Sequence, residues 1–185
     1  MIKKYRLGLR AVLVAFCVVA AVFAAGCGKP TESKTPASGR GGYSVVDATK
    51  TRIDFTYKPQ RIVSLGLSAD EVLLDMVEPE RIAALTYLAD DAGISPAAAK
   101  AERVKGRVQS GSLESVLAQQ PDLVLVPDWT DLNFVELLRG AKVPVYVYKT
   151  PTTVKEIKQT ICELANVVDE RVAGGKIVAK MEKEL

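Results

Sequence analysis

The sequence predicts an α/β fold: a mostly parallel sheet flanked by helices, with a β-hairpin before it and the start of a long linking helix at its end. Short apolar runs alternate with amphipathic segments from residue 61 onward. Residues 123–126 are four apolar residues in a row, which is typical of a strand covered by helices on both faces. Strands that alternate with helices are joined by right-handed crossovers, and these connect parallel neighbours.

The first 27 residues are predicted to form a lipoprotein signal peptide. The basic segment MIKKYRLGLR precedes an apolar run over 11–25 that is shorter than the ~20 residues of a permanent membrane span. The tetrad AAGC resembles a lipobox, in which Cys27 becomes the lipidated N-terminus, although Leu is commoner than Ala24 three residues before the cysteine. An ordinary cleaved signal or an uncleaved anchor is the alternative.

Charge and cysteine content limit the remaining chain. It has 25 Lys and Arg against 22 Asp and Glu, but four of the basic residues lie in the leader, which has no acid. The rest is close to neutral, so a nucleic-acid partner is not expected. Only Cys162 remains after Cys27, which excludes an intramolecular disulfide there.

A polar stretch and a hairpin follow the leader. Residues 28–42 are rich in Gly, Pro, Ser and Thr without apolar periodicity, which predicts a disordered tether. Residues 43–57 contain two β-like runs around a polar turn at 47–50. Ile53, Phe55 and Tyr57 alternate with polar residues, as in a half-buried strand.

The first two core strands enclose a helix. Residues 61–65 (RIVSL) are predicted as the first strand and 82–86 (IAALT) as the second, with Tyr87 directly at its carboxyl end. Between them Ser68 and Glu71 have the spacing of a capping box, which predicts that the helix starts at Ser68.

The third strand follows an irregular region. Gly and Pro interrupt residues 88–110, where only 96–104 could form a short helix. A longer helix then begins with Ser112 as its cap, and Pro121 ends it at the preceding residue. Residues 123–126 form the third strand.

The sequence of residues 131–185 predicts three helices and a fourth strand. The helices cover 131–139, 153–168 and 169–185, and the strand covers 143–148. The second helix opens with a capping box (TVKE), and the third has a box-like start at Asp169. Gly174 and Gly175 weaken the third helix by about 1 kcal/mol each.

Ligands of parallel sheets bind outside the carboxyl ends of the strands. Tyr87 and Trp129, the only tryptophan, lie at that edge, and their rings suit a flat or bulky ligand. Ser68 and Asp128 lie on the same edge, so we predict these four as ligand-binding residues. In the alternative interpretation the two rings fold back onto the core. The edge comprises residues 66–68, 87–91, 127–130 and 149–152.

The sequence offers little for catalysis. It has no histidine, which removes the commonest metal ligand and the usual base of Ser/His or Cys/His catalysis. It contains no CxxC pair, Gly-rich phosphate loop or GxSxG motif. Asp90 with Asp91, or Asp128 with Asp131, could form carboxylate pairs, but acidic loop residues are usually solvated. We therefore predict no catalytic residue, no metal site and no cofactor.

The order of four segments resembles a known family. RIVSL, SADEVLL, GSLESVLAQQPDLVLV and LLRGAKVPVYVYKTPTTVKEIKQTICELANVV are similar to the iron-siderophore and cobalamin class of substrate-binding proteins of ABC importers. The resemblance covers about residues 43–185. It implies that 43–168 form one α/β lobe, that 169–185 begin the helix linking it to a second lobe, and that ligand is held between the lobes.

The resemblance also assigns roles to single residues. Tyr87 matches a ligand-facing aromatic position, and Trp129 lies two residues past another, which is Pro127 here. Val108 occupies a third position where a relative has an aromatic residue. Glu114 matches the glutamate that docks onto arginines of the permease. The absence of histidine argues against the related zinc and manganese receptors.

The prediction is therefore an exported, lipid-anchored protein of the cell envelope that captures an iron-siderophore, haem or cobalamin-like ligand for an ABC permease. A complete relative needs roughly another domain of 100 or more residues. The alternatives are thus a truncated sequence, a non-functional remnant, or a single lobe that acts as an envelope interaction module. A hydrolase is disfavoured by the missing histidine and nucleophile motifs.

Overall fold

The computed structural model describes residues 42–185. The predicted signal peptide, the lipidation site at Cys27 and the tether up to residue 41 lie outside the described residues. The first described element is the predicted hairpin, in which β1 (Tyr43–Val46) pairs antiparallel with β2 (Arg52–Phe55). Tyr57, predicted to continue the second strand, lies beyond its end and is exposed.

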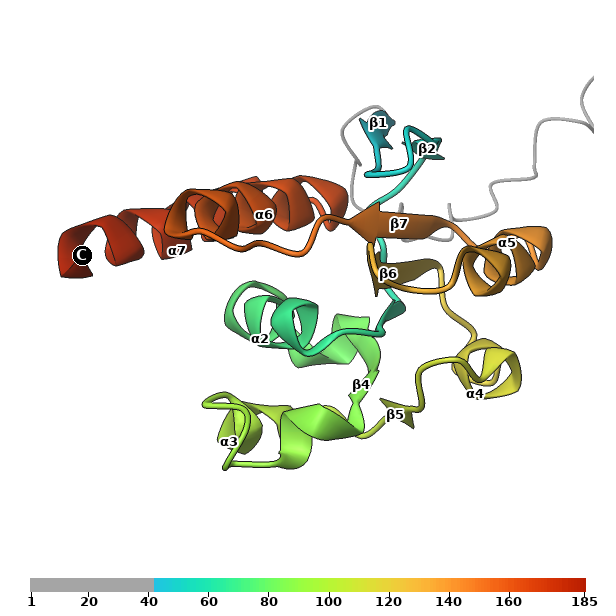
Figure 1. The fold of residues 1–185 in the computed structure, drawn as a ribbon, viewed down its shortest axis with the longest axis horizontal. Helices are drawn as coiled ribbons and strands as arrows, with labels where there is room; N and C mark the ends of the chain where they lie inside the picture. The colour runs from blue at the N-terminus through green and yellow to red at the C-terminus, as the bar shows by residue number, and fades with distance from the viewer. Residues whose placement is uncertain (1–41) are drawn as a thin grey trace, which may run out of the picture. The chain divides into compact units, whose positions relative to one another are not determined.

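A parallel sheet of five strands forms the centre of the domain (Figure 1). Its order is β5-β4-β3-β6-β7, and every neighbouring pair is parallel. Four of the strands were predicted; the fifth, β5, has two residues, too few for a periodic pattern to reveal it. The strands are β3 (Ile62–Ser64), β4 (Ile82–Thr86), β5 (Arg107–Val108), β6 (Leu123–Pro127) and β7 (Val145–Tyr148).

Helices cover both faces of this sheet, as predicted. In Figure 1, α2, α6 and α7 lie on one side of the strands, and α4 and α5 lie on the other. Short 3-10 turns at Pro79–Arg81 and Tyr87–Asp90 flank β4. The helices are α2 (Leu67–Met76), α3 (Ala98–Ala101), α4 (Leu113–Leu117), α5 (Leu132–Gly140), α6 (Val154–Val167) and α7 (Arg171–Glu184).

Strand β6 shows why a continuous apolar run predicts a central strand. It lies between β3 and β7, and all its residues are buried. Leu123 and Leu125 join the core beneath α2, α6 and α7, whereas Val124 and Val126 join the core beneath α4 and α5. Successive side chains of a strand point to opposite faces, so both faces require apolar residues here.

The hairpin packs against the outer end of the sheet. The Tyr43 ring stacks on Phe55 with centroids 5.0 Å apart, and its hydroxyl donates to the Val167 carbonyl at 2.6 Å. In the turn, the backbone N–H of Ala48 donates to the carbonyl of Val147 at 2.8 Å. The turn therefore covers part of the open edge of β7, which would otherwise expose unpaired backbone groups.

Two predicted helix caps are confirmed and two are wrong. Ser112 accepts a hydrogen bond from the Ser115 backbone, and Thr153 accepts one from Glu156. Helix α2, however, starts at Leu67 with Gly66 as its cap, so Ser68 lies inside the first turn. Helix α7 starts at Arg171 after Glu170, without a side-chain cap.

The start of α7 is held by buried Arg81. Its guanidinium donates to the Pro59 and Val168 carbonyls, both at 2.8 Å, and pairs with Glu170 at 2.5 Å. Gly174 then lies so close to Ala165 on α6 that an added Cβ would collide with it. The sequence-based view of Gly174 as a simple weakness misses this close approach of two helices. None of the helices within residues 42–185 is long and apolar enough to cross a membrane.

Candidate functional site

The carboxyl ends of the strands surround a cavity of about 340 Å³. Three of the four predicted ligand-binding residues, Ser68, Tyr87 and Trp129, contribute to its wall. Val108, which occupies a position where a relative has an aromatic residue, lines the cavity too. The cavity is lined by Leu65, Gly66, Leu67, Ser68, Thr86, Tyr87, Leu88, Val108, Gln109, Ser110, Trp129 and Tyr148. None of these side chains is charged, and the wall is mainly apolar.

Two large rings stand at this cavity without being buried. The side chains of Tyr87 and Trp129 are 63% and 67% exposed. They do not fold back onto the core, so the structure decides against that interpretation. Tyr87 opens a 3-10 turn directly after β4, and Trp129 follows the last residue of β6 by two positions. Each ring is held at the rim because its strand ends there.

Trp129 also borders a second hollow of about 220 Å³. This hollow extends toward Asp131 and Phe134 at the start of α5, and it shares Leu65, Ser110 and Trp129 with the larger cavity. The Trp129 side chain therefore borders both hollows.

The floor of the cavity depends on a close approach at Gly66. A Cβ at this position would collide with the Tyr148 hydroxyl and come within 3.3 Å of Pro127. The Tyr148 hydroxyl lies 3.1 Å from the Ser68 hydroxyl, which explains why Ser68 does not cap its helix. Burial raises the pKa of Tyr148 to about 12, so the phenol stays protonated at neutral pH. The floor therefore offers two hydroxyl groups.

Buried Asp70 supports this wall from beneath, and sequence reasoning missed it. One carboxylate oxygen accepts from the Thr86 N–H at 3.1 Å and from the Thr86 hydroxyl at 2.6 Å. The other oxygen is buried without a hydrogen-bond partner among the described residues. The sequence did contain an indication of this role, because Asp70 lies on the side of α2 that faces the core. Its neighbour Ala69 and Leu73, about one turn further on, are both buried.

Asp70 thereby joins the first turn of α2 to the end of β4, directly before Tyr87. Burial raises the pKa of its carboxyl to about 6, and the hydrogen bonds from Thr86 act in the opposite direction. The carboxyl consequently titrates close to physiological pH, far above an exposed aspartate.

The fourth predicted residue, Asp128, does not line the cavity. Its carboxylate accepts from the Thr150 N–H at 3.1 Å and so joins the loops after β6 and β7. Asp131 caps α5. Asp90 forms a two-point ion pair with Arg107, with one contact at 2.8 Å, and this pairing lowers the pKa of Asp90. These carboxylates brace loops, and neither of the two considered pairs faces a shared reaction centre.

Glu114 lies on the first turn of α4 and is exposed. It follows Ser110 of the cavity wall by four residues, so it sits near the candidate site without lining it. Across residues 42–185 there is no group of three or more acidic or cysteine side chains placed to hold a metal ion.

The sequence profile of one family, described as "Periplasmic binding protein", matches residues 62–185. A protein named "Cobalamin-binding protein" in two strains of Halobacterium salinarum is 25% identical over 140 residues. The match covers 73% of this chain but 36% of that protein. The chain thus spans about a third of the length of these curated relatives.

Solved structures share the fold. The structure titled "holo-ViuP" superposes with a TM-score of 0.63 at 19% identity, covering 76% of this chain and 48% of that one. The "heme binding protein HmuT" gives 0.62 at 20% identity, covering 78% and 46%. A "possible" iron-binding protein from Staphylococcus epidermidis gives 0.58 at 20%, covering 68% and 48%. The described fold therefore corresponds to about half of each, as expected for one lobe.

Proposed function

The chain belongs to the periplasmic binding protein family, and from that premise we propose that it captures an iron-siderophore, haem or cobalamin-like ligand for an ABC permease. The family consists of binding proteins, which agrees with the prediction that the chain is not an enzyme. Relatives whose names specify cobalamin or heme binding support this range of ligands.

The observation that carries the proposal is the cavity rimmed by Tyr87 and Trp129. Two large exposed rings at the mouth of an apolar cavity leave apolar surface in contact with water, which is unfavourable. A ligand that covers the rings removes this unfavourable contact. Ser68 and Tyr148 add hydroxyl groups that orient a bound molecule. Small-molecule sites combine apolar walls with a few polar groups in this way.

The wall further favours one kind of ligand. The lining of this cavity carries no charged side chain, so the lining has no cation to balance a strongly anionic complex. A broad, largely apolar ring system, such as haem or a corrinoid, gains most from stacking on Tyr87 and Trp129. We accordingly propose that these ligands bind more tightly than an anionic ferric catecholate.

Delivery and location complete the proposal. Glu114 is exposed on α4 beside the cavity, in a position to present the loaded lobe to a cationic surface of the permease. The family supports an extracytoplasmic location, and a lipid on Cys27 would keep the protein at the membrane.

The test uses the only tryptophan of the chain as its probe. Purified protein is titrated with haemin, cyanocobalamin, a ferric hydroxamate and a ferric catecholate siderophore, and Trp129 fluorescence is followed beside calorimetry. Saturable quenching with matching calorimetric affinity for one of these ligands supports the proposal. Absence of heat and of saturable quenching with all four, from a protein shown to be folded, would instead favour the single-lobe interaction module.

A further inference from the structure

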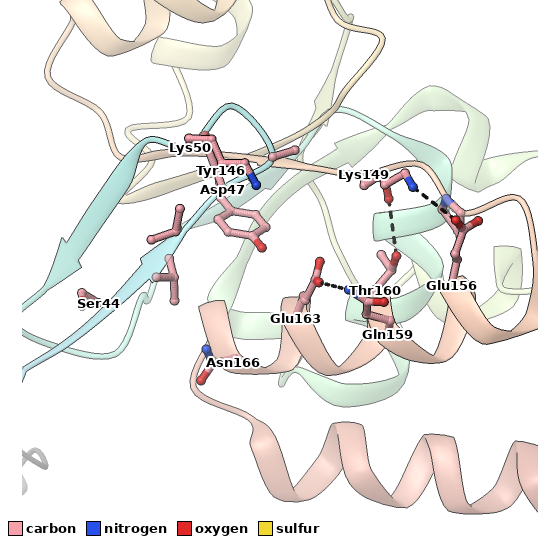
Figure 2. Close-up of a pocket in the computed structure, with 14 residues that line it drawn as sticks. Ser44, Asp47, Lys50, Tyr146, Lys149, Glu156, Gln159, Thr160, Glu163 and Asn166 are labelled. Atoms are coloured by element: carbon pink, nitrogen blue, oxygen red, sulfur yellow. Dashed lines mark hydrogen bonds and ion pairs between the residues drawn. The ribbon is translucent and has the colours of Figure 1, made fainter.

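A polar cleft of about 510 Å³ lies beside β7 and is distinct from the carboxyl-edge cavity (Figure 2). Its walls come from the β1–β2 hairpin, from β7 and from α6, and it shares no lining residue with the cavity at Tyr87 and Trp129. Its volume lies within the range of roughly 300–1,000 Å³ that small-molecule sites occupy. The proposed function does not use it.

Tyr146 is one of the buried polar residues that line this cleft. Its side chain is 4% exposed, and Figure 2 shows its hydroxyl directed into the cleft without a hydrogen bond to any residue drawn. Tyr43 and Tyr148, the other buried or half-buried tyrosines of the core, both bond through their hydroxyls. The Tyr146 hydroxyl is not one of the buried, unpartnered polar atoms of residues 42–185, so it reaches the open space of the cleft. It can donate there to water or to a molecule that displaces the water.

The hydroxyl of Tyr146 remains a donor over a wide pH range. Burial raises its pKa to about 12, and the negative charges of Glu163 and Asp47 act in the same direction. A group bound in the cleft can thus accept a hydrogen bond from it at neutral pH.

One positively and one negatively charged side chain of the cleft have polar atoms that remain available for hydrogen bonds. Lys50, on the hairpin turn, forms no ion pair with the described residues. Glu163, on α6, accepts from the Gln159 amide at 2.8 Å through one oxygen, and its second oxygen has no partner among residues 42–185.

The other acidic groups of the cleft are occupied. Asp47 receives backbone hydrogen bonds from its own turn and an ion pair from Arg139. Glu156 binds Lys149 and Thr152. Three groups of the cleft therefore remain available to a ligand: the ammonium group of Lys50, one carboxylate oxygen of Glu163 and the hydroxyl of Tyr146. Lys50 and Glu163 lie on opposite walls, and Tyr146 lies between them.

We propose that this cleft is a second binding site, for a small zwitterion with a free amino group and a free carboxylate, such as an amino acid. Lys50 binds the carboxylate, Glu163 binds the ammonium group, and Tyr146 donates a hydrogen bond to the ligand. Charge-assisted hydrogen bonds are stronger than those between neutral groups. A ligand with only a carboxylate would be attracted by Lys50 but repelled by Glu163, and a ligand with only an ammonium group would meet the reverse, so a ligand with both groups is favoured.

The test measures binding of glycine, leucine, glutamine and phenylalanine to the purified chain by amide NMR. Each is used in its zwitterionic form, as the N-acetyl derivative without the ammonium group, and as the amide without the carboxylate; glycerol serves as a neutral control. We expect at least one zwitterion to shift resonances around Lys50, Tyr146 and Glu163. Its blocked forms should bind about tenfold more weakly.

Variants locate the site. Tyr146→Phe removes one oxygen without changing the packed ring and should weaken binding about fivefold. Tyr57→Phe, the same change at an exposed tyrosine that lines neither cavity, should leave it unaltered. Lys50→Met should remove the preference for the zwitterion over the amide. No shifts with any amino acid, shifts confined to Tyr87 and Trp129, or equal affinity for glycerol would each overturn the proposal. None of these results depends on whether haem or corrinoid binds at the other cavity.

Discussion

One carboxylate oxygen of Asp70 accepts hydrogen bonds from both donors of Thr86, its backbone N–H and its hydroxyl. Thr86 ends β4, and Tyr87 follows it at the rim of the cavity. A fully buried carboxyl on α2 therefore determines how the end of β4 meets the first turn of that helix. Several properties of the candidate site depend on this pair and on its neighbours.

Asp70 should make stability depend on pH. Because burial raises its pKa to about 6, the folded state binds more protons than the unfolded state between about pH 4 and 6. Stability from this group is thus complete below pH 4 and is lost as the pH rises through 6, by roughly 3 kcal/mol. Urea unfolding at pH 4.5 and 7.5 should show about 2 kcal/mol of this loss in the wild type relative to Asp70→Asn, which cannot ionise. A difference between the two proteins that is the same at both pH values would contradict the assignment.

Removal of either rim ring should weaken ligand binding. Tyr87→Ala or Trp129→Ala removes a stacking surface and should reduce affinity for whichever of the four titrated ligands binds the wild type by about tenfold, measured by calorimetry. Tyr57→Ala is the matched control, because Tyr57 is 61% exposed and lines neither cavity. Unaltered affinity in both rim variants would mean that the rings do not touch the ligand.

Glu114→Ala should separate delivery from capture. If the carboxylate contacts the permease only, uptake in cells falls while ligand affinity of the purified protein stays within about twofold. Glu102→Ala, which removes an exposed carboxylate that forms no ion pair within residues 42–185, should change neither quantity. A large loss of affinity in Glu114→Ala would exclude the docking role.

The adjacent glycines of α7 should respond in opposite directions. Gly174→Ala forces a methyl group into Ala165 and should lower the free energy of unfolding by about 1–3 kcal/mol. Gly175 has open space around its Cβ position, so Gly175→Ala should raise stability by up to about 1 kcal/mol through helix propensity. Denaturant unfolding of the two variants measures both effects. Equal effects would show that the close approach of α6 and α7 is not maintained in solution.

The lipid anchor is tested at Cys27. Metabolic labelling with a fatty-acid analogue should mark the wild-type protein and leave it in the membrane fraction, because buried acyl chains contribute about 0.8 kcal/mol per CH₂. Cys27→Ser should abolish the label and release the protein. A labelled Cys27→Ser variant would place the lipid elsewhere.

The sequence alone determined the fold class and most of the elements. Alternation of apolar runs with amphipathic segments is a local pattern, and burial of every residue of β6 follows from four consecutive apolar side chains. The helix caps at Ser112 and Thr153 were predictable because a cap involves residues only three positions apart. Tyr87 and Trp129 could be placed at the rim because Tyr87 directly follows a predicted strand and Trp129 lies three residues after the end of another.

Features that depend on residues far apart in the chain could be found only in the folded structure. Strand β5 exists because two residues pair with the end of β4, and Ser68 turns toward Tyr148, eighty positions away. Asp70 became part of the site through Thr86, across the gap between a helix and a strand. Tyr146 and Tyr148 look alike in sequence, as alternate residues of one strand, yet one lines the hairpin cleft and the other the cavity at the carboxyl ends of the strands. The physical reason is that a residue's neighbours across a fold are set by packing of whole elements, which no local pattern encodes.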